Sequence, residues 1–445
     1  MGYLGLFLGL VLVAVAVYRG WNITIAAFFG CIVFIITGGL SVLESTNAFF
    51  AAWGSFATSF FGKMVFSAMF AKLYEVSGAG TSIAIGISKL FFRENASRGV
   101  KVALCFLVGI ICQFVLVIGG VGPVLGIFMT MPIFFPLMKQ AGVPRRFGVP
   151  ALVAGALSFG NVAAGAPTNG NVMIVNHLGG TASDGALSSY IVLAIELVVV
   201  VFILTKMAIK AMDKGEYFEY GPSFKPLANQ ARPNAIYALL PMVVVFVLFG
   251  VMNWDINVSL CVGIPMAIIM FFPWLTVKEG SKNKTTGKLS GLKGSLSTAV
   301  VSTLSPLNGM AATSGMAAVM KNTEAYNGLI NAVQNWNMNA YWLTAIITIV
   351  MCFVVAGNAT SMNIALPIVR PIAEASGASL KAVGRISAIA GSTFDTVPYS
   401  GTLNMFCSLC DCTMKEVYPS VFFATILPPM GATVLEIILC SIGII

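Results

Sequence analysis

The sequence has little charge for its length. Only 9% of its 445 residues are Asp, Glu, Lys or Arg, whereas soluble proteins carry roughly 25%. It contains a single histidine, and it shows no Walker loop, no HExxH pair and no Ser-His-Asp order. These absences argue against ATP-driven transport and against hydrolysis. We therefore expect a protein that is not an enzyme and that needs no cofactor.

Apolar residues dominate instead, at 58% of the chain. Apolar runs of spanning length or nearly so recur along the sequence: Leu4–Val17, Ile23–Ile36, Tyr190–Leu204, Ala235–Val251 and Val258–Leu275. The chain has room for about a dozen such segments and for no large soluble domain. This composition predicts an all-α polytopic membrane protein embedded in a lipid bilayer.

The net charge of +9 does not indicate a nucleic-acid partner, because the basic residues fall in short loops between apolar runs. Four basic clusters hold 17 of the 25 Lys and Arg residues: Lys89/Arg93/Arg98/Lys101, Lys139/Arg145/Arg146, Lys206/Lys210/Lys214/Lys225/Arg232 and Lys278/Lys282/Lys284/Lys288/Lys293. The positive-inside rule places all four in the cytoplasm. The polar stretch Ala325–Asn339 has almost no basic residue, so we expect it outside.

This topology divides the chain into two halves, 1–212 and 233–445, inserted in opposite orientations and joined by a cytoplasmic linker at 213–232. Two stretches read as copies of one broken-helix motif. Gly160, Pro167 and Gly170 of the first recur as Gly391, Pro398 and Gly401 of the second. Proline removes a backbone donor and glycine tolerates non-helical dihedral angles, so each stretch predicts an interrupted helix. A duplicated interruption is a sequence pointer to a transporter's binding site.

The similarity continues upstream of the breaks. Met131–Gly142 pairs with Leu366–Gly377, and Gly119–Pro123 pairs with Val354–Asn358. Each half therefore predicts a re-entrant hairpin, with its tip near Gly122 or Gly357, followed by a broken helix. Thr81–Arg93 has apolar residues at helical spacing with basic residues beside them, which predicts an interfacial helix.

Two tips and two breaks that converge from opposite sides predict a polar site near the midplane. Helix amino termini carry about half a positive charge, so the site suits an anion without a buried arginine. The candidate substrate-binding residues are polar side chains or tip glycines: Gly122, Asn161, Thr168, Asn169, Asn171, Asn358, Thr360, Ser361, Ser392, Thr393, Thr396, Ser400 and Thr402.

Carboxylates inside apolar segments are costly and mark function. Asp395 lies inside the second break, where it either couples an ion or proton or caps freed amide groups. Asn363 and Glu196 complete the predicted coupling group, with structural pairing as the alternative for Glu196 and likewise for Glu436. The lone His177 is either a proton relay or a structural helix residue whose ring nitrogens are hydrogen-bonded. Two interpretations are open for a cluster of three cysteines: Cys407, Cys410 and Cys412. They form either a soft-metal or redox-responsive site, or a set of small residues packed along a helix.

Several of these residues carry a resemblance to a known family. They are Pro144–Arg146 leading into Gly160–Asn171, then Gly357-Asn-Ala-Thr followed by Leu366-Pro-Ile, and above all Arg385-Ile-Ser-Ala-Ile-Ala-Gly-Ser-Thr-Phe-Asp-Thr-Val-Pro398. The chain resembles the gluconate permease (GntP-type) family, within the ion transporter superfamily of secondary carboxylate transporters. The resemblance spans essentially the whole length.

The resemblance implies a homodimer in the bacterial inner membrane that works as an elevator. Scaffold spans would occupy about 1–80 and 233–320, and transport parts about 100–212 and 340–445. Relatives often have His-Asn where this chain has Tyr399-Ser400, and a Leu-Pro-Gly-Thr-Pro type run where it has Ala164–Asn169. The first departure argues against a histidine-based proton step at this position. The second indicates a difference in substrate from those relatives.

The expected function is a symporter for a small organic anion, such as gluconate or a related carboxylate, coupled to H+ or Na+. A di- or tricarboxylate carrier of the same superfamily is the alternative. An anion channel would need a continuous polar lining rather than paired breaks. A membrane enzyme would need a reactive cluster, yet the cysteine group and His177 fall in different predicted elements.

Overall fold

The computed structural model describes residues 2–91, 97–118, 123–166, 168–222, 232–248, 252, 254–275, 284–328 and 338–445. Within these ranges the chain is helical and contains no β-strand, which confirms the predicted class. The helices of the first half are α1 (Gly2–Tyr18), α2 (Ile23–Gly38), α3 (Val42–Val76), α4 (Ala79–Phe91), α5 (Arg98–Ile118), α6 (Pro123–Ala141), α7 (Gly148–Val153), α8 (Asn169–Leu178) and α9 (Ala186–Asp213). Those of the second half are α10 (Ala235–Phe246), α11 (Ile256–Phe271), α12 (Lys284–Lys321), α14 (Ala340–Val355), α15 (Asn358–Ser376), α16 (Leu380–Ala390), α17 (Gly401–Leu409), α18 (Met414–Thr425) and α19 (Leu427–Ser441).

Four segments are long and apolar enough to cross a membrane: Arg98–Ile118, Ala186–Asp213, Ile256–Trp274 and Met414–Ser441. Shorter apolar helices include α1, α2 and α14. Large apolar side chains point outward, as on α9, where Val198 is 70% exposed and Phe202 is 61% exposed. Polar groups such as Glu196 and Glu436 are buried instead. An apolar exterior around buried polar groups is the pattern of a multi-pass membrane protein.

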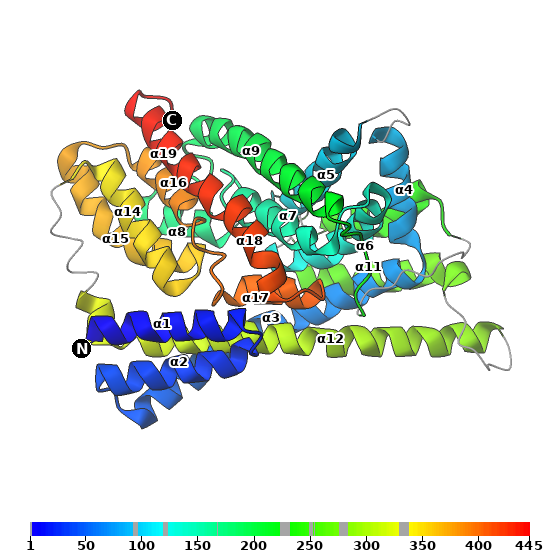
Figure 1. Ribbon diagram of the computed structural model, residues 1–445, viewed down its shortest axis with the longest axis horizontal. Coiled ribbons are helices and arrows are strands. Elements are labelled where there is room, and N and C mark those ends of the chain that lie inside the picture. The colour runs from blue at the N-terminus through cyan, green and yellow to red at the C-terminus, as the bar shows by residue number, and fades with distance from the viewer. Residues whose placement is uncertain are drawn as a thin grey trace.

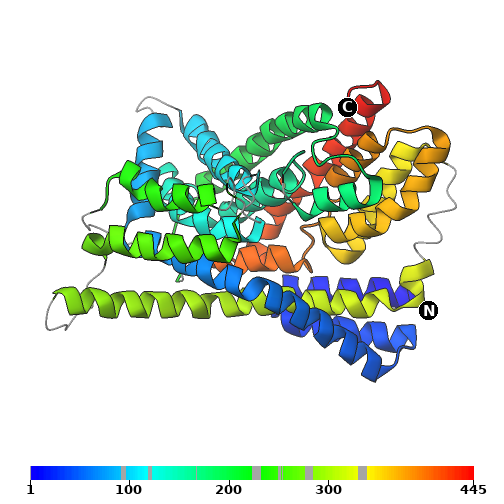
Figure 2. The ribbon, with the colours of Figure 1, turned by 180° about the vertical axis from the view of Figure 1, so that it is seen from behind.

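Two long helices, α3 and α12, form one layer of the molecule with α1 and α2 (Figure 1). Helix α2 packs on α12, and α11 packs on α3. The helices approach closely where glycine replaces a side chain: a Cβ on Gly315 of α12 would lie within 3 Å of the Phe49 ring of α3. Seen from behind, α10 and α11 continue this layer toward α4 (Figure 2).

The remaining helices form a second layer over α3 and α12. Helices α5 and α6 pack as one antiparallel pair, and α14 and α15 pack as another at the opposite end of the molecule (Figure 1). Each second member contains two prolines four residues apart: Pro132 and Pro136 in α6, and Pro367 and Pro371 in α15. The turn between α14 and α15 falls at Ala356–Gly357, where the sequence predicts a hairpin tip.

Both predicted breaks are present. Helix α7 passes into a π-helical segment, Ala154–Gly160, and an irregular stretch separates it from α8. In the second half, α16 ends at Ala390 and α17 begins at Gly401. A π-helical turn is rare and is often found beside functional sites. Gly122 and Pro167, on which part of the prediction rests, lie outside the described residues.

The predicted interfacial helix corresponds to α4, which packs against α6 and α10. Of the predicted linker, residues 213–222 and 232 are described. The segment after α9 lies over the turn before α7, since the Arg146 guanidinium donates to both carboxylate oxygens of Glu216 at 2.7 and 2.9 Å. The boundaries of the two predicted halves stay a prediction.

Candidate functional site

A cavity of about 190 Å³ lies between the two layers. We call it the Thr360 cavity. Its walls come from the α14–α15 turn, the start of α17, Phe56 of α3, and Met310–Met320 of α12. Its polar lining residues are Thr313, Ser314, Thr360, Thr402 and Tyr399. The hydroxyl groups of Thr313 and Tyr399 donate to the carbonyl oxygens of Met310 and Phe353, so they are available to a ligand as acceptors. Two residues predicted as substrate ligands, Thr360 and Thr402, therefore meet in one cavity although they come from different motifs.

Two helix amino termini point into this region. Helix α15 begins at Asn358 with Gly357 as its N-cap, and α17 begins at Gly401 with Ser400 as its N-cap. Gly357 and Gly401 both line the Thr360 cavity, and its described lining contains no Lys, Arg, His, Asp or Glu. The positive ends of two helix dipoles, with hydroxyl donors around them, favour an anion.

The tip residue Asn358 reaches both breaks. Its Nδ2 donates to the Ala388 carbonyl oxygen at 2.9 Å, at the end of α16. Its Oδ1 lies 2.7 Å from the position that a Cβ on Gly170 would occupy, at the start of α8. The side chain is 2% exposed, and Oδ1 has no hydrogen-bond partner in the described part of the chain. A buried acceptor without a donor is costly, which favours a ligand or ion at this point.

Asp395 lies beside the same tip and is 4% exposed. Its carboxylate accepts a hydrogen bond from the backbone N–H of Asn358, so it sits at the positive end of α15. This contact matches the capping role that the sequence left open. A negative charge fixed there offsets the positive end of α15 until a cation or proton neutralises it, so the geometry accommodates both roles of Asp395.

The first break is held by local hydrogen bonds. The Thr168 hydroxyl caps α8 by accepting from the Asn171 N–H at 3.4 Å, and it donates to the Asn161 carbonyl oxygen at 3.1 Å. Asn171 Nδ2 donates to the carbonyl oxygens of Ala163 and Ala166, both at 2.8 Å. The carbonyl groups that the break frees from helical bonding are satisfied by side chains of α8 and its cap.

The second break uses similar contacts. Ser400 caps α17, and Asn404 Nδ2 donates to the carbonyl oxygens of Pro398 and Ser400 at 2.7 and 2.8 Å. The Tyr399 hydroxyl donates to the Phe353 carbonyl oxygen and ties the break to α14. The sequence prediction did not include Asn404. Its spacing was an available signal, because Asn404 follows the N-cap Ser400 by four residues and Asn171 follows the N-cap Thr168 by three.

Arg385 is a second residue that the predicted site did not include. It is fully buried in α16, and its Nη2 donates to Asn171 Oδ1 at 2.7 Å. Gly185 lets the chain pass close to it, because a Cβ there would lie 2.2 Å from Arg385 Cγ, and the glycine has φ of +70°. Through Asn171, this arginine of the second half fixes the first break. A lone arginine in the apolar run 382–390 was the available signal.

Other predicted substrate ligands are not among the residues that line the Thr360 cavity. Ser361, Ser392 and Thr393 donate their hydroxyl groups to carbonyl oxygens three residues earlier, each at 2.7 Å. Thr396 bonds Thr425 at 2.9 Å. Asn161 is half-buried at the first break and Asn169 is exposed in the first turn of α8, while Gly122 lies outside the described residues. Their roles in binding stay predictions.

The other predicted coupling residues lie apart from Asp395. Asn363 is exposed, and its Oδ1 lies 2.8 Å from His177 Nε2. Glu196 is buried beside a separate cavity of about 270 Å³ between α9 and α19. Glu436 accepts from the Ser188 hydroxyl at 2.7 Å. Of the four residues, Asp395 alone contacts the hairpin tip in the described structure.

The cysteine cluster lies where α17 meets α18. All its thiols are free, and the Cys412 N–H donates to the Cys407 carbonyl oxygen at 2.9 Å, which closes the turn. Within the described ranges no group of three or more His, Cys, Asp or Glu side chains is placed to hold a metal ion. These contacts agree with the packing role that the sequence left open.

Comparison with known proteins gives a distant likeness to a solved structure. No family model matches the chain, and no curated protein matches it. Among solved structures, it is similar to the crystal structure of the YdaH transporter of Alcanivorax borkumensis, with 12% sequence identity and a TM-score of 0.36. The similarity covers 95% of this chain and 99% of that one. The resemblance to gluconate permeases stays a prediction.

Proposed function

We propose that the protein is a secondary active transporter, not an enzyme, and that it carries a small organic anion by symport with H+ or Na+. The observation that carries this proposal is the Thr360 cavity, where two helix amino termini and five hydroxyl-bearing side chains surround a space without a charged side chain in its described lining. A carboxylate is the anion that such a site suits. The sugar acid gluconate is the first candidate.

The lining also bears on the alternative substrates. Citrate carries up to three negative charges at neutral pH, and a buried trianion needs cationic partners. Helix dipoles supply about half a charge each, which matches a single carboxylate better than three. The hydroxyl groups of Thr313, Ser314, Thr360 and Thr402 provide hydrogen-bonding partners for a polyhydroxylated chain. A sugar acid is therefore favoured over a citrate-like substrate.

We further propose two inverted repeats and an elevator motion. The hairpins α5–α6 and α14–α15 lie at opposite ends of the molecule (Figures 1 and 2), and each half continues with a broken helix. In this proposal α3 and α12 belong to a scaffold that dimerises in the bacterial inner membrane, and the second layer moves against it. An anion channel is less well supported, because it would need a continuous polar lining, whereas Phe56, Met310 and Met320 make part of the wall of the Thr360 cavity apolar.

Binding and exchange test the function. Thermal unfolding of purified protein should be measured with gluconate, citrate and acetate, each with and without Na+. A true substrate at a hundredfold excess over its Kd stabilises the protein by about 2.7 kcal/mol. Labelled gluconate should also exchange across proteoliposomes at equal concentrations, because carriers show counterflow and channels do not. Flux without counterflow would establish a channel and overturn the proposal.

Sidedness tests the proposed topology. We expect a cysteine that replaces Lys214 to react with an impermeant thiol reagent only from the cytoplasm. A cysteine that replaces Met338 should react only from outside. Both positions are exposed, and peptide mass spectrometry can follow each one despite the native thiols. Labelling of both positions from the same side contradicts the inverted arrangement.

The contact of α17 with α12 gives a further prediction. A Cβ on Gly401 would lie 2.3 Å from Thr313 Oγ1 and 3.1 Å from Met310 Cα. Gly401→Ala should therefore push the two layers apart, lower the unfolding free energy by about 1–3 kcal/mol, and slow transport. Adding Thr313→Ala removes the closest atom and should restore part of both losses in a double-mutant cycle. Strict additivity of the two substitutions contradicts this contact.

A further inference from the structure

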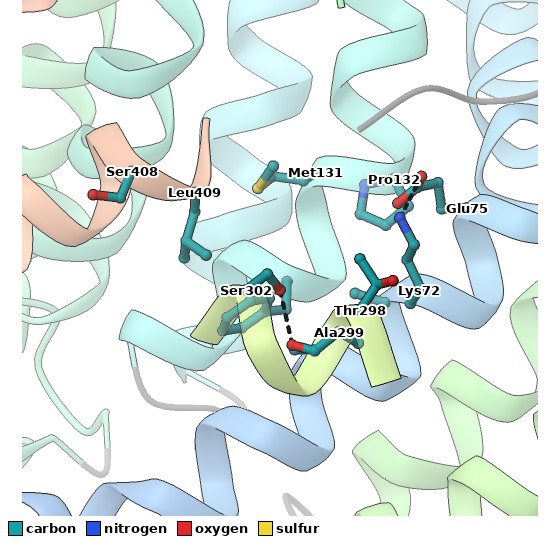
Figure 3. Close-up of a pocket in the computed structure, with 12 residues that line it drawn as sticks. Lys72, Glu75, Met131, Pro132, Thr298, Ala299, Ser302, Ser408 and Leu409 are labelled. Atoms are coloured by element: carbon teal, nitrogen blue, oxygen red, sulfur yellow. Dashed lines mark hydrogen bonds and ion pairs between the residues drawn. The ribbon is translucent and has the colours of Figure 1, made fainter. Parts of the chain in front are cut away.

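A second cavity, of about 120 Å³, lies between the same two layers (Figure 3). We call it the Lys72 cavity. Helices α3, α12 and α17 line it, as they line the Thr360 cavity, and Phe128, Met131 and Pro132 of α6 close it. The Thr360 cavity touches the first residues of α17, Gly401 and Thr402, whereas the Lys72 cavity touches its last residues, Ser408 and Leu409.

The two cavities are therefore displaced along the helices that they share. From Phe56 to Lys72 on α3 is 16 residues, which span about 24 Å at 1.5 Å per residue. From Thr313 to Ser302 on α12 is 11 residues, which span about 16 Å in the same geometry. On α17, Thr402 and Ser408 are six residues apart, which span about 9 Å. The three shared helices thus place the lining of the Lys72 cavity about 9–24 Å from that of the Thr360 cavity, toward the end of the layer where the cytoplasmic clusters are predicted.

The Lys72 cavity contains an ion pair. Lys72 Nζ lies 2.8 Å from Glu75 Oε1, and their side chains are 15% and 9% exposed. Figure 3 shows the pair beside Pro132, on the side of the cavity that Thr298 also lines. Both residues belong to α3, and each makes a further contact besides this ion pair. A largely buried ion pair is weak grounds for stability, because desolvation of the charges offsets their attraction.

We propose that the Lys72 cavity is a second anion-binding site, in which Lys72 binds the carboxylate of the transported substrate and Glu75 is the partner that the substrate replaces. This proposal rests on the function proposed above. The intact pair has no net charge, so it does not repel an anion that enters. The Lys72 ammonium has three donors, and Glu75 competes for them with a group of the same chemistry as the substrate.

This competition makes the site weak, which suits release into the cytoplasm. A substrate bound at the Thr360 cavity is held by helix dipoles and hydroxyl groups, with no competing carboxylate in the described lining. At the Lys72 cavity, the Glu75 carboxylate remains within reach of Lys72 and displaces the substrate again. Thr298, Ser302 and Ser408 also line this cavity. Their hydroxyl groups donate to carbonyl oxygens of their own helices, so they can accept hydrogen bonds from the hydroxyl groups of a sugar acid.

A cysteine that replaces Ser302, an exposed residue of this cavity, can report the local charge. Its reaction rates with an anionic and a cationic methanethiosulfonate reagent should be measured in inside-out vesicles by peptide mass spectrometry. We expect Glu75→Gln to speed the anionic reagent and to slow the cationic reagent by about fivefold each, and Lys72→Gln to do the reverse, which is the effect of one charge about 4 Å away in water. A cysteine at Thr313 is the matched control, since it lies beyond the screening length of about 8–10 Å.

Protection by anions distinguishes a binding site from a structural ion pair. Gluconate or acetate, compared with equal chloride, should slow labelling of the Ser302 cysteine. Lys72→Gln should abolish this protection, Lys72→Arg should restore it, and Glu75→Gln should lower the concentration required. Protection that is absent, or that persists in Lys72→Gln, overturns the second site. Carboxylate exchange in the same vesicles tests the proposed function separately, because failed exchange leaves a Lys72-dependent acetate protection intact.

Discussion

Asn358→Ala is expected to abolish substrate binding while the protein still folds and inserts. The substitution removes the one side chain of the second tip that touches both breaks, at Ala388 and Gly170. It leaves the buried Ala388 carbonyl oxygen without this donor and removes the Oδ1 acceptor, so the loss in binding should reach about 1–3 kcal/mol or more. Thermal-shift titration with gluconate and counterflow of labelled gluconate measure it.

Two matched variants sharpen this test. Asn363→Ala removes an amide from the same helix, α15, but at an exposed position that contacts His177, so binding should remain close to wild type. Gly170→Ala keeps Asn358 but places a Cβ 2.7 Å from its Oδ1, so it should weaken binding nearly as much. Unchanged uptake kinetics in Asn358→Ala would remove the tip from the binding site.

The positions of the breaks could be predicted because they depend on local chemistry. Proline and glycine favour an interruption where they cluster with small polar residues, and both irregular segments lie within the stretches that begin at Gly160 and Gly391. A proline alone is not sufficient, because Pro132 and Pro367 lie inside continuous helices. The N-caps Thr168 and Ser400 follow the same logic, since a hydroxyl before a helix start accepts from its first amides. The α14–α15 turn at Gly357 could be predicted from local sequence in the same way.

The direction of each hydroxyl group could not be predicted in this way. Ser392 and Thr393 sit just after the end of α16, where a short hydroxyl side chain bonds a carbonyl oxygen of the preceding turn instead of a ligand. The opposite wall of the Thr360 cavity, formed by Phe56 and Thr313, comes from helices with no motif. Only long-range packing brings those residues to the breaks.

The contact between Arg385 and Asn171 shows the same limit. The two residues are 214 positions apart, and each has an ordinary helical setting in the sequence. Once α16 packs near α8, the guanidinium satisfies an amide that in turn satisfies two carbonyl oxygens of the first break. Packing of the second half therefore adds to the local hydrogen bonds that hold the first break. A sequence motif within one half does not indicate a contact with the other half, so this contact could not be predicted.

Asp395→Asn is expected to abolish accumulation of substrate against a gradient and to preserve exchange at equal concentrations. The asparagine has nearly the same shape, and its Oδ1 still accepts from the Asn358 N–H at the start of α15. It removes the negative charge that a coupled Na+ or proton requires. Driven uptake and counterflow of labelled gluconate, measured in the same proteoliposomes, separate the two activities.

Comparison with Asp395→Ala distinguishes coupling from capping. Alanine also loses the cap, so it should lower the unfolding free energy by about 0.5–2 kcal/mol relative to Asp395→Asn. If Asp395 serves only as a cap, the asparagine variant will accumulate substrate like wild type and only the alanine variant will be impaired. Accumulation by Asp395→Asn under a pH gradient alone would show that Asp395 is not the proton carrier. Glu196, with its buried Oε1 that lacks a hydrogen-bond partner among the described residues, then becomes the next residue to replace, as Glu196→Gln.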